Sequence, residues 1–208
     1  MRITKEYDER KAEILDTAET LFYRKGYELC SVNEILMAIG IAKGTFYHYF
    51  KSKEEVLDTI VARNTALLLT RANEVVSMDT LAPAEKLLRA CMAMKMTDHI
   101  DSALLADMHK SENVLLHQKT LNSVVLGMAP LLVTVVEEGV RAGIWSCRFP
   151  LEYMQIFLSA TLTLTDEGIF SLDAESQMKV MAALIALLEK MVNAPVDSFM
   201  QMFMQAQK

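Results

Sequence analysis

The sequence predicts an all-α protein in which three helices form an N-terminal unit, followed by a long helix and a larger helical remainder. Apolar residues recur at the 3.6-residue period of an amphipathic helix, and no segment shows the alternation expected of a strand. Two sequences typical of helix starts, Ser31-Val-Asn-Glu34 and Ser52-Lys-Glu-Glu55, lie close together. The chain of 208 residues has only seven glycines and four prolines, as suits long regular helices.

The first predicted helix runs from Asp8 to Lys25. Its apolar residues form one stripe at the helical period: Ile14, Leu15, Ala18, Leu21 and Phe22. Basic residues lie at its end, where they match the helix dipole, and Gly26 supplies a left-handed cap.

The next two predicted helices are short and are separated by a tight turn. Ser31-Val-Asn-Glu34 is a capping box, in which the first and last side chains bond to each other's backbone amides. Gly40 ends the helix that follows, and another helical segment begins near Lys43. Ser52-Lys-Glu-Glu55 is a second capping box and starts the long helix. A helix, a short glycine-containing turn and a second helix make the layout of a helix-turn-helix.

The remainder is predicted to be helical throughout, with one domain over residues 1–52 and a second over 53–208. Pro130 lies inside the longest helix of the second domain and is expected to kink or break it. The predicted helices cover residues 53–77, 83–96, 101–111, 114–142, 150–168 and 174–193, with a short amphipathic helix in the tail 194–208.

A basic, aromatic segment lies in the N-terminal unit. Residues 40–53 contain four aromatics, three lysines, one histidine and no acid, although the chain has a formal net charge of −6. Residues 1–53 hold nine Lys/Arg and eight Asp/Glu, whereas the rest of the chain holds twelve and nineteen. The N-terminal quarter is therefore the part that can approach a polyanion without strong repulsion, and its predicted partner is double-stranded DNA.

Within residues 42–50 the spacing separates a core face from an open face. Phe46 and Phe50, four residues apart, are predicted to be buried. A lysine on the open face can reach a guanine edge or a phosphate, and aromatic residues with polar tips can bind phosphates. The predicted DNA contacts are Ser31, Ala42, Lys43, Gly44, Thr45, Tyr47, His48, Tyr49 and Lys53.

The same residues resemble the DNA-binding domain of the TetR (tetracycline-repressor-like) family of bacterial regulators. The resemblance rests on Gly40-Ile-Ala-Lys-Gly-Thr-Phe-Tyr-His-Tyr-Phe-Lys-Ser-Lys-Glu-Glu-Val-Leu57, preceded by Ala18-x-x-Leu-Phe-x-x-x-Gly-Tyr27 and Ser31-Val-x-x-Ile35. It implies a three-helix head joined by a long helix to a C-terminal ligand-binding and dimerisation domain. It also implies which residues face bases, namely Lys43, Gly44 and Thr45, and which hold phosphates, namely Ser31, Tyr47, His48, Tyr49 and Lys53.

The resemblance implies a homodimer that binds a palindromic operator as a repressor and is released by a small-molecule effector. An architectural or division-control protein that uses the same head without an effector stays open as an alternative. An enzyme is not expected, because the sequence has no paired carboxylates, no nucleophile motif such as GxSxG and no metal-ligand spacing. We therefore expect no cofactor and no metal site.

An effector cavity is expected among the middle helices, which are rich in methionine, a residue that fills irregular space. An ordinary close-packed core is the other interpretation of the same residues. The residues expected around a mainly apolar effector are Met92, Met96, Leu105, Met108, Val124, Met128, Phe157 and Thr165, with His109, Asn113 and Thr161 as polar anchors.

The last two long helices are expected to pair with those of a second subunit in a four-helix bundle. Small residues on the first would allow close approach, and an apolar stripe follows on the second. The residues expected at this interface are Ser159, Thr163, Met178, Met181, Ala182, Ile185, Leu188 and Val192.

A cytoplasmic protein without membrane attachment is expected. The N-terminus lacks the apolar core of a signal peptide, and the three cysteines show no disulfide spacing. The most apolar run, residues 124–136, contains Gly127 and Pro130 and is shorter than the about 20 residues that cross a bilayer.

Overall fold

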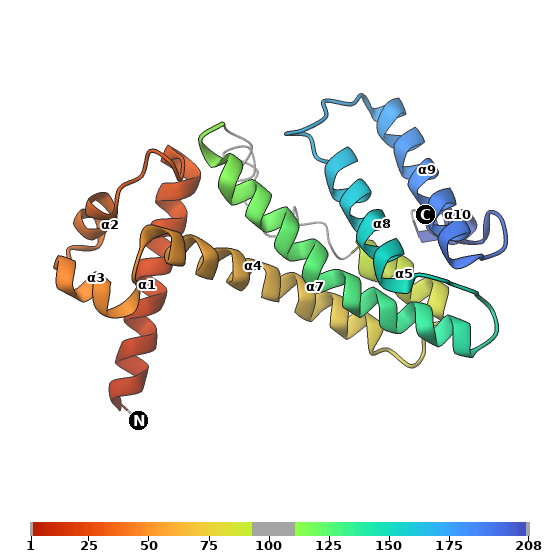
Figure 1. Ribbon diagram of the computed structural model, residues 1–208, viewed down its shortest axis with the longest axis horizontal. Helices are drawn as coiled ribbons and strands as arrows, with labels where there is room; N and C mark the ends of the chain where they lie inside the picture. Colours follow the sequence, from red (N-terminus) through yellow and green to blue (C-terminus); the bar gives the residue numbers. More distant parts are fainter. Residues whose placement is uncertain (1, 93–110, 207–208) are drawn as a thin grey trace. The chain divides into compact units, whose positions relative to one another are not determined.

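The computed structural model describes residues 2–92 and 111–206, and every regular element in this part of the chain is a helix (Figure 1). The α-helices are α1 (Arg2–Lys25), α2 (Val32–Ile39), α3 (Lys43–Tyr49), α4 (Lys53–Val76), α5 (Pro83–Met92), α7 (Val114–Arg141), α8 (Pro150–Leu164), α9 (Ala174–Val192) and α10 (Ser198–Ala206). A short 3-10 helix, η2 (Ser111–Asn113), precedes α7. The predicted all-α class is confirmed.

Two helix boundaries differ from the prediction. Helix α1 begins at Arg2 rather than at Asp8, so the helix includes polar turns that the apolar stripe did not reach. Helix α8 ends at Leu164 instead of Gly168, because the chain turns at Asp166, whose carbonyl accepts the Phe170 amide at 2.8 Å.

Helix α7 continues through Pro130 from Val114 to Arg141, so of the predicted kink or break the break does not occur, and the kink stays a prediction. Pro130 is exposed. The helix predicted over residues 101–111 falls, apart from its last residue, outside the described part of the chain.

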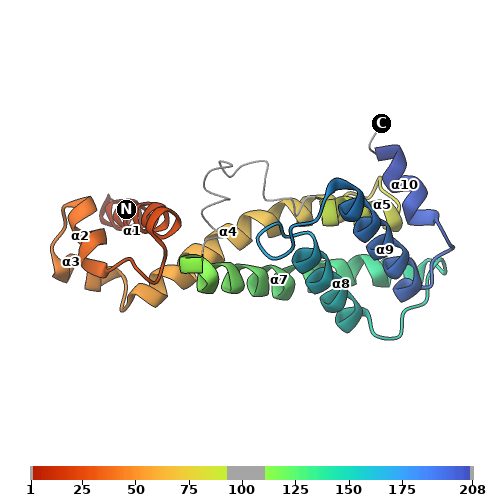
Figure 2. The ribbon, with the colours of Figure 1, turned by 90° about the horizontal axis from the view of Figure 1, so that it is seen from above.

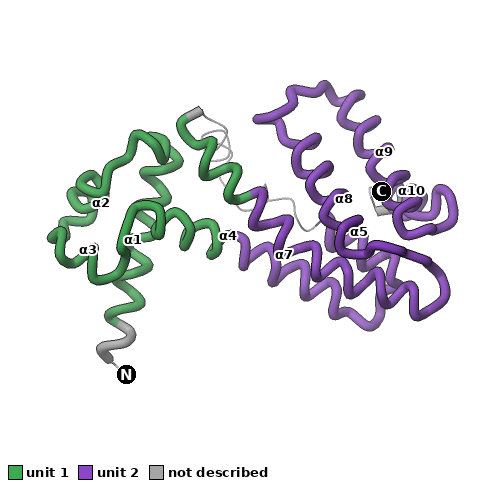
Figure 3. Tube along the Cα trace, viewed as in Figure 1, with its two compact units in different colours: residues 1–64, 99–120 green, residues 65–98, 121–208 purple. Residues whose placement is uncertain are grey.

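The chain forms two compact units, each with its own core (Figure 3). In the described residues, unit 1 comprises 2–64 and 111–120, and unit 2 comprises 65–92 and 121–206. Unit 1 therefore includes the first three turns of α4 and the residues around η2, in addition to the predicted head 1–52. The division of the domains at residue 52 stays a prediction.

The core of unit 1 is built where α1, α2, α3 and the start of α4 meet. Helix α2 packs on both α1 and α3. The apolar stripe expected on α1 is buried at Ile14, Leu15, Ala18 and Phe22. Its partners from the other helices include Ile35, Leu36, Phe46, Phe50, Val56, Leu57 and Ile60, all buried.

The core of unit 2 is formed by the second half of α4, α5, most of α7, and α8 to α10. Helix α9 packs on α8 and α10, and α10 also packs on α5, as the two views in Figures 1 and 2 show. The Trp145 and Phe199 rings meet edge to face at 5.7 Å, and Phe199 is fully buried. The tail helix α10 is thus part of this core.

A buried carboxylate fixes the start of α10. Glu189 on α9 is only 4% exposed, and its oxygens accept the backbone amides of Asp197 at 3.0 Å, Phe199 at 2.8 Å and Met200 at 3.3 Å. Free amides and the dipole at a helix N-terminus favour a negative charge. Glu189 therefore connects α9 to α10.

Helix α7 is long and apolar enough to pass a length-and-composition test for crossing a membrane, with a mean hydropathy of 1.6 over its most apolar window. Buried helices of soluble proteins pass the same test. The residues Val124, Met128, Leu132, Val135 and Val136 of α7 are buried in the core of unit 2. We interpret α7 as a core helix.

Candidate DNA-binding interface

Helix α3 has an aromatic face in the core of unit 1 and a polar face at the surface. Phe46 is fully buried and Phe50 is 2% exposed, and their ring centroids lie 6.0 Å apart. Lys43 and His48 are exposed, as is 47% of Tyr47. The two predicted core positions are confirmed, and the three polar residues lie where a ligand can reach them.

The turn before α3 depends on Gly40. Its φ of 78° is left-handed, and its amide donates to the Leu36 carbonyl at 2.9 Å. Ala42 follows in an extended conformation and begins α3 without a side-chain cap. A Cβ added at exposed Gly44 would meet no atom within 4 Å, so the surface of α3 is open at its first turn.

An aromatic cluster connects the start of α1 to the end of α3. The Tyr7 ring lies 4.6 Å from that of Tyr49 and 5.8 Å, edge-on, from that of His48. Both Tyr7 and Tyr49 are half-buried. The sequence prediction missed Tyr7, although the 3.6-residue spacing of Tyr7, Lys11 and Ile14 would have extended the stripe of α1 back to it.

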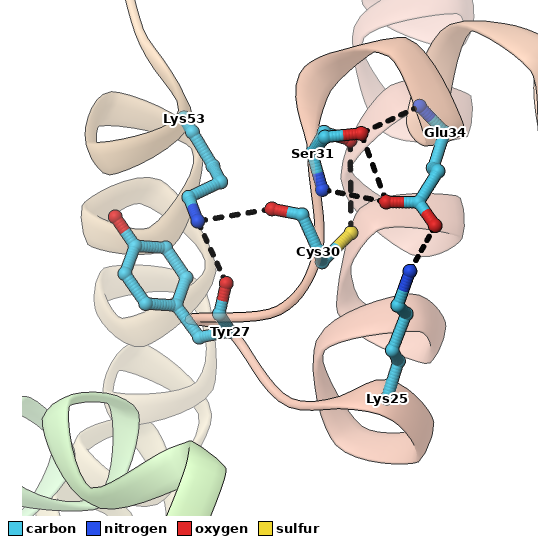
Figure 4. A network of polar contacts seen from close by, with 6 residues as sticks. All are labelled: Lys25, Tyr27, Cys30, Ser31, Glu34 and Lys53. Atoms are coloured by element: carbon cyan, nitrogen blue, oxygen red, sulfur yellow. Dashed lines mark hydrogen bonds and ion pairs between the residues drawn. The ribbon is translucent and has the colours of Figure 1, made fainter.

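Lys53, predicted to hold a phosphate, contacts the turn between α1 and α2 (Figure 4). Its Nζ donates to the Tyr27 carbonyl at 2.7 Å and to the Cys30 carbonyl at 2.9 Å. The same ammonium lies 4.1 Å from the centroid of the Tyr27 ring, a cation–π distance. The side chain therefore has partners inside the protein.

Ser31 is the cap of α2, and its hydroxyl is already engaged. The hydroxyl donates to Glu34 Oε2 at 2.8 Å and accepts the Glu34 amide at 3.3 Å, while the Ser31 amide donates to the same carboxylate at 2.8 Å. The predicted capping box is confirmed. The bonds from Lys25 and Ser31 lower the pKa of Glu34 to about 2. A phosphate at Ser31 would have to replace this carboxylate.

The second capping box is formed only in part. The Glu55 amide donates to Ser52 Oγ at 3.1 Å, as expected. The Glu55 carboxylate, however, accepts the Lys51 amide at 2.6 Å. Glu55 thus fixes the backbone between α3 and α4.

Asn113, predicted as a polar anchor for an effector, lies in unit 1 and holds the same α1–α2 turn. It is fully buried, its Oδ1 accepts the Tyr27 amide at 2.9 Å, and its Nδ2 donates to the Tyr23 carbonyl at 3.3 Å. A Cβ added at Gly26, whose φ is 98°, would overlap with the Glu112 side chain. These contacts correct the prediction: Asn113 stabilises the head.

The other predicted effector residues lie on several helices of unit 2. Val124, Met128 and Phe157 are buried in its core. Thr161 Oγ1 is buried without a hydrogen-bond partner, and exposed Thr165 donates to the Thr161 carbonyl at 2.8 Å. Exposed Met92 ends α5. Four predicted residues, Met96, Leu105, Met108 and His109, lie outside the described residues.

The predicted dimer residues divide into two groups. Ile185, Leu188 and Val192 are buried by their own chain, because this stripe of α9 faces the core of unit 2. They are not available to a partner, and the prediction is corrected for these three. The rest retain exposed or half-buried surface: Ser159, Thr163, Met178, Met181 and Ala182.

Two family models match the chain. The model described as "Bacterial regulatory proteins, tetR family" matches residues 14–60, and "Tetracyclin repressor-like, C-terminal domain" matches residues 95–187. The first contains α2 and α3, and the second contains all of α7 and α8 and most of α9.

Individual proteins agree with these matches. The chain is 29% identical over 154 residues to the repressor KstR2 of Rhodococcus jostii, which covers 73% of this chain and 76% of KstR2. It is 43% identical over 61 residues to the regulator YfiR of Bacillus subtilis, a match that spans only 29% of this chain and 30% of YfiR. The fold is similar to that of E. coli NemR in its reduced form, with a TM-score of 0.59 and 19% identity over 89% of this chain and 98% of NemR. With a helix-turn-helix head, an all-α fold and matches to both family models, the chain belongs to the TetR family of DNA-binding transcriptional regulators, which are not enzymes.

Proposed function

We propose that this protein is a homodimeric, cytoplasmic repressor that binds a palindromic operator and releases it when a small molecule binds. The surface of α3 is the observation that carries the DNA-binding part of the proposal. Lys43, Tyr47 and His48 are exposed on it, while buried Phe46 and Phe50 fix the helix to the core. Because residues 40–53 contain no acid, a phosphate backbone can approach this surface without local repulsion.

The homodimer is supported by the outer surface of α8 and α9. Ile156 is 53% exposed, Met178 72% and Leu187 38%, although all three are large and apolar. Two copies that bury this surface around a two-fold axis would present two α3 helices to one duplex. Adjacent half-sites in the major groove lie about 34–36 Å apart. Sedimentation should show a dimer at micromolar concentration, and a monomer there would contradict this part of the proposal.

The effector is proposed to be mainly apolar and to bind in unit 2. The Thr161 hydroxyl, buried without a partner, supports this, because a ligand with one hydrogen-bonding group would satisfy it. The apolar residues expected around the ligand include Val124, Met128 and Phe157 of the same unit. A coupling of about 1–3 kcal/mol would change operator affinity about 5–150-fold. A thermal-shift screen of apolar compounds tests this proposal, followed by measurement of operator affinity with each compound that stabilises the protein. If none of these compounds changes the operator affinity, the effector-independent alternative is favoured.

Selection of bound sequences from a random DNA pool tests the proposed function directly, since a palindrome is expected. About 6–10 phosphate contacts would lower affinity by about 10³–10⁵ between 50 and 200 mM salt. Lys43→Met should weaken binding and reduce the salt slope by about 0.9, whereas Lys190→Met, at an exposed position of α9, should change neither. Failure to enrich any sequence, or a flat salt response, would contradict DNA recognition.

A further inference from the structure

We infer that Lys53 is a positioning residue for DNA recognition: it holds the α1–α2 turn that orients the helix-turn-helix, and it does not bind a phosphate. This inference rests on the proposed DNA-binding function. It assigns to Lys53 a role different from that expected of an exposed lysine at the start of a helix.

The contacts of Lys53 carry the inference. An ammonium group has three donors, and two of them go to the Tyr27 and Cys30 carbonyls at 2.7 and 2.9 Å. The Tyr27 ring covers it at 4.1 Å. Tyr27 is 6% exposed and Cys30 1%, so both carbonyls belong to residues that the protein buries. Lys53 is thus bonded to backbone groups of two buried residues of unit 1.

The turn that Lys53 holds leads directly to the DNA-binding helices. Cys30 precedes Ser31, which caps α2, and α2 packs on α1 and α3. Figure 4 shows Lys53 on one side of this turn and the Ser31–Glu34 capping box, with Lys25, on the other. Because Lys53 is the first residue of α4, its side chain sets the position of the α2 cap relative to α4.

A phosphate contact would require Lys53 to give up these bonds. The ammonium would leave two carbonyls of buried residues, each of which accepts a charge-assisted hydrogen bond. Lys43 and Lys51 are exposed on the same segment and can meet a phosphate without any such loss. The three lysines of residues 40–53 therefore have two different roles. Lys43 and Lys51 supply positive charge to the DNA-binding surface, and Lys53 holds the α1–α2 turn in position.

The salt dependence of operator binding separates the two roles. A lysine that neutralises a phosphate contributes about 0.9 to the slope of log K against log[salt], whereas a positioning lysine contributes nothing to it. The probe is a duplex that carries the sequence selected by the wild-type protein. Lys53→Met is expected to weaken binding about tenfold at every salt concentration with an unchanged slope. Lys43→Met, the matched control, is expected to lower the slope.

Two results with Lys53→Met would overturn the inference: a slope lower by about 0.9, or an affinity equal to that of the wild type. Hydrogen exchange gives a local check, since the amides of Cys30 and Ser31 should exchange faster in Lys53→Met and not in Lys43→Met. If the wild type selects no DNA, the proposed function itself fails, and that outcome is visible before any variant is made.

NMR of the wild type keeps the test available if Lys53→Met does not fold. The ¹⁵N–¹H signal of the Lys53 ammonium should keep its chemical shift on binding the same duplex and show no coupling to ³¹P. A ³¹P coupling at Lys53 would show a phosphate contact and overturn the inference.

Discussion

Removing the Asn113 side chain should destabilise the protein, because the side chain bonds to the backbone of Tyr27 and of Tyr23. In Asn113→Ala, the buried Tyr27 amide loses its 2.9 Å partner, at a cost of about 1–3 kcal/mol. The Tyr23 carbonyl loses a 3.3 Å bond, which contributes about 0.5–1.5 kcal/mol. The expected loss of unfolding free energy is about 2–4 kcal/mol, and Tm should fall by about 5–15 °C in a chain of this size.

Urea and thermal unfolding measure this loss, and Asn33→Ala is the matched control. Asn33 is exposed on α2, so its replacement should change the free energy of unfolding by less than about 0.5 kcal/mol. Hydrogen exchange of the Tyr27 amide should accelerate in Asn113→Ala alone. If Asn113→Ala were as stable as Asn33→Ala, the contact between η2 and the α1–α2 turn would not stabilise the head, and our account of Asn113 would be wrong.

Three further predictions concern charged groups. Because the pKa of Glu34 is lowered to about 2 from 4.5, its contribution to stability is present above pH 4.5 and is lost as the pH falls towards 2. In urea unfolding across this range, the difference in unfolding free energy between Glu34→Gln and the wild type should shrink as the pH falls. A constant difference would refute the role of Glu34. Lys86 is 4% exposed and is paired with the more exposed Glu138 at 2.9 Å. Glu138→Ala should cost about 3 kcal/mol of unfolding free energy, because it leaves a buried charge unpaired, whereas Lys86→Met should cost less than about 1 kcal/mol. Equal losses in the two variants would contradict the unpaired buried charge as the cause. Glu189→Ala should release the start of α10 and lower the free energy of unfolding by about 2–3 kcal/mol. Limited proteolysis should then cut the chain near residue 197. An uncut tail would refute the capping role of Glu189.

The helical framework could be predicted from the sequence because its signals are local. The cap of α2 at Ser31 and its end at Gly40 are both encoded within a few residues, and the structure confirms them. Burial of Phe46 and Phe50 follows from the same helical period. Of the kink or break expected at Pro130, the break did not occur, because packing of α7 in the core outweighs one missing hydrogen bond.

The roles of individual polar residues could not be predicted, because their partners are distant backbone groups. Lys53 bonds to carbonyls 26 and 23 residues away, and Asn113 bonds to backbone groups 86 and 90 residues away. Backbone carbonyls carry no sequence signal, so an exposed lysine and a buried one look alike in the sequence. The stripe of α9 posed the same problem, since Leu188 is equally suited to its own core and to a partner subunit.

The charge pattern of the head becomes clearer with the structure. Several of its acids are paired with cations of the same unit: Asp16 and Glu19 with Arg63 at 2.6 Å each, and Asp58 with Lys119 at 2.6 Å. These pairs involve α1, α4 and α7, and none involves α3. The acidic composition of the protein is therefore compatible with a surface on α3 that attracts DNA.

The α1–α2 turn is held from two sides by helices that continue into unit 2. Lys53 begins α4, which runs to Val76, and Asn113 directly precedes α7, which runs to Arg141. Both side chains bond to the backbone of Tyr27, one at its carbonyl and the other at its amide. A displacement of either helix relative to Tyr27 would therefore lengthen one of these two bonds. Hydrogen bonds weaken as they lengthen. The backbone of Tyr27 is therefore a point at which a displacement of α4 or α7 would alter bonds that hold the turn before the α2 cap.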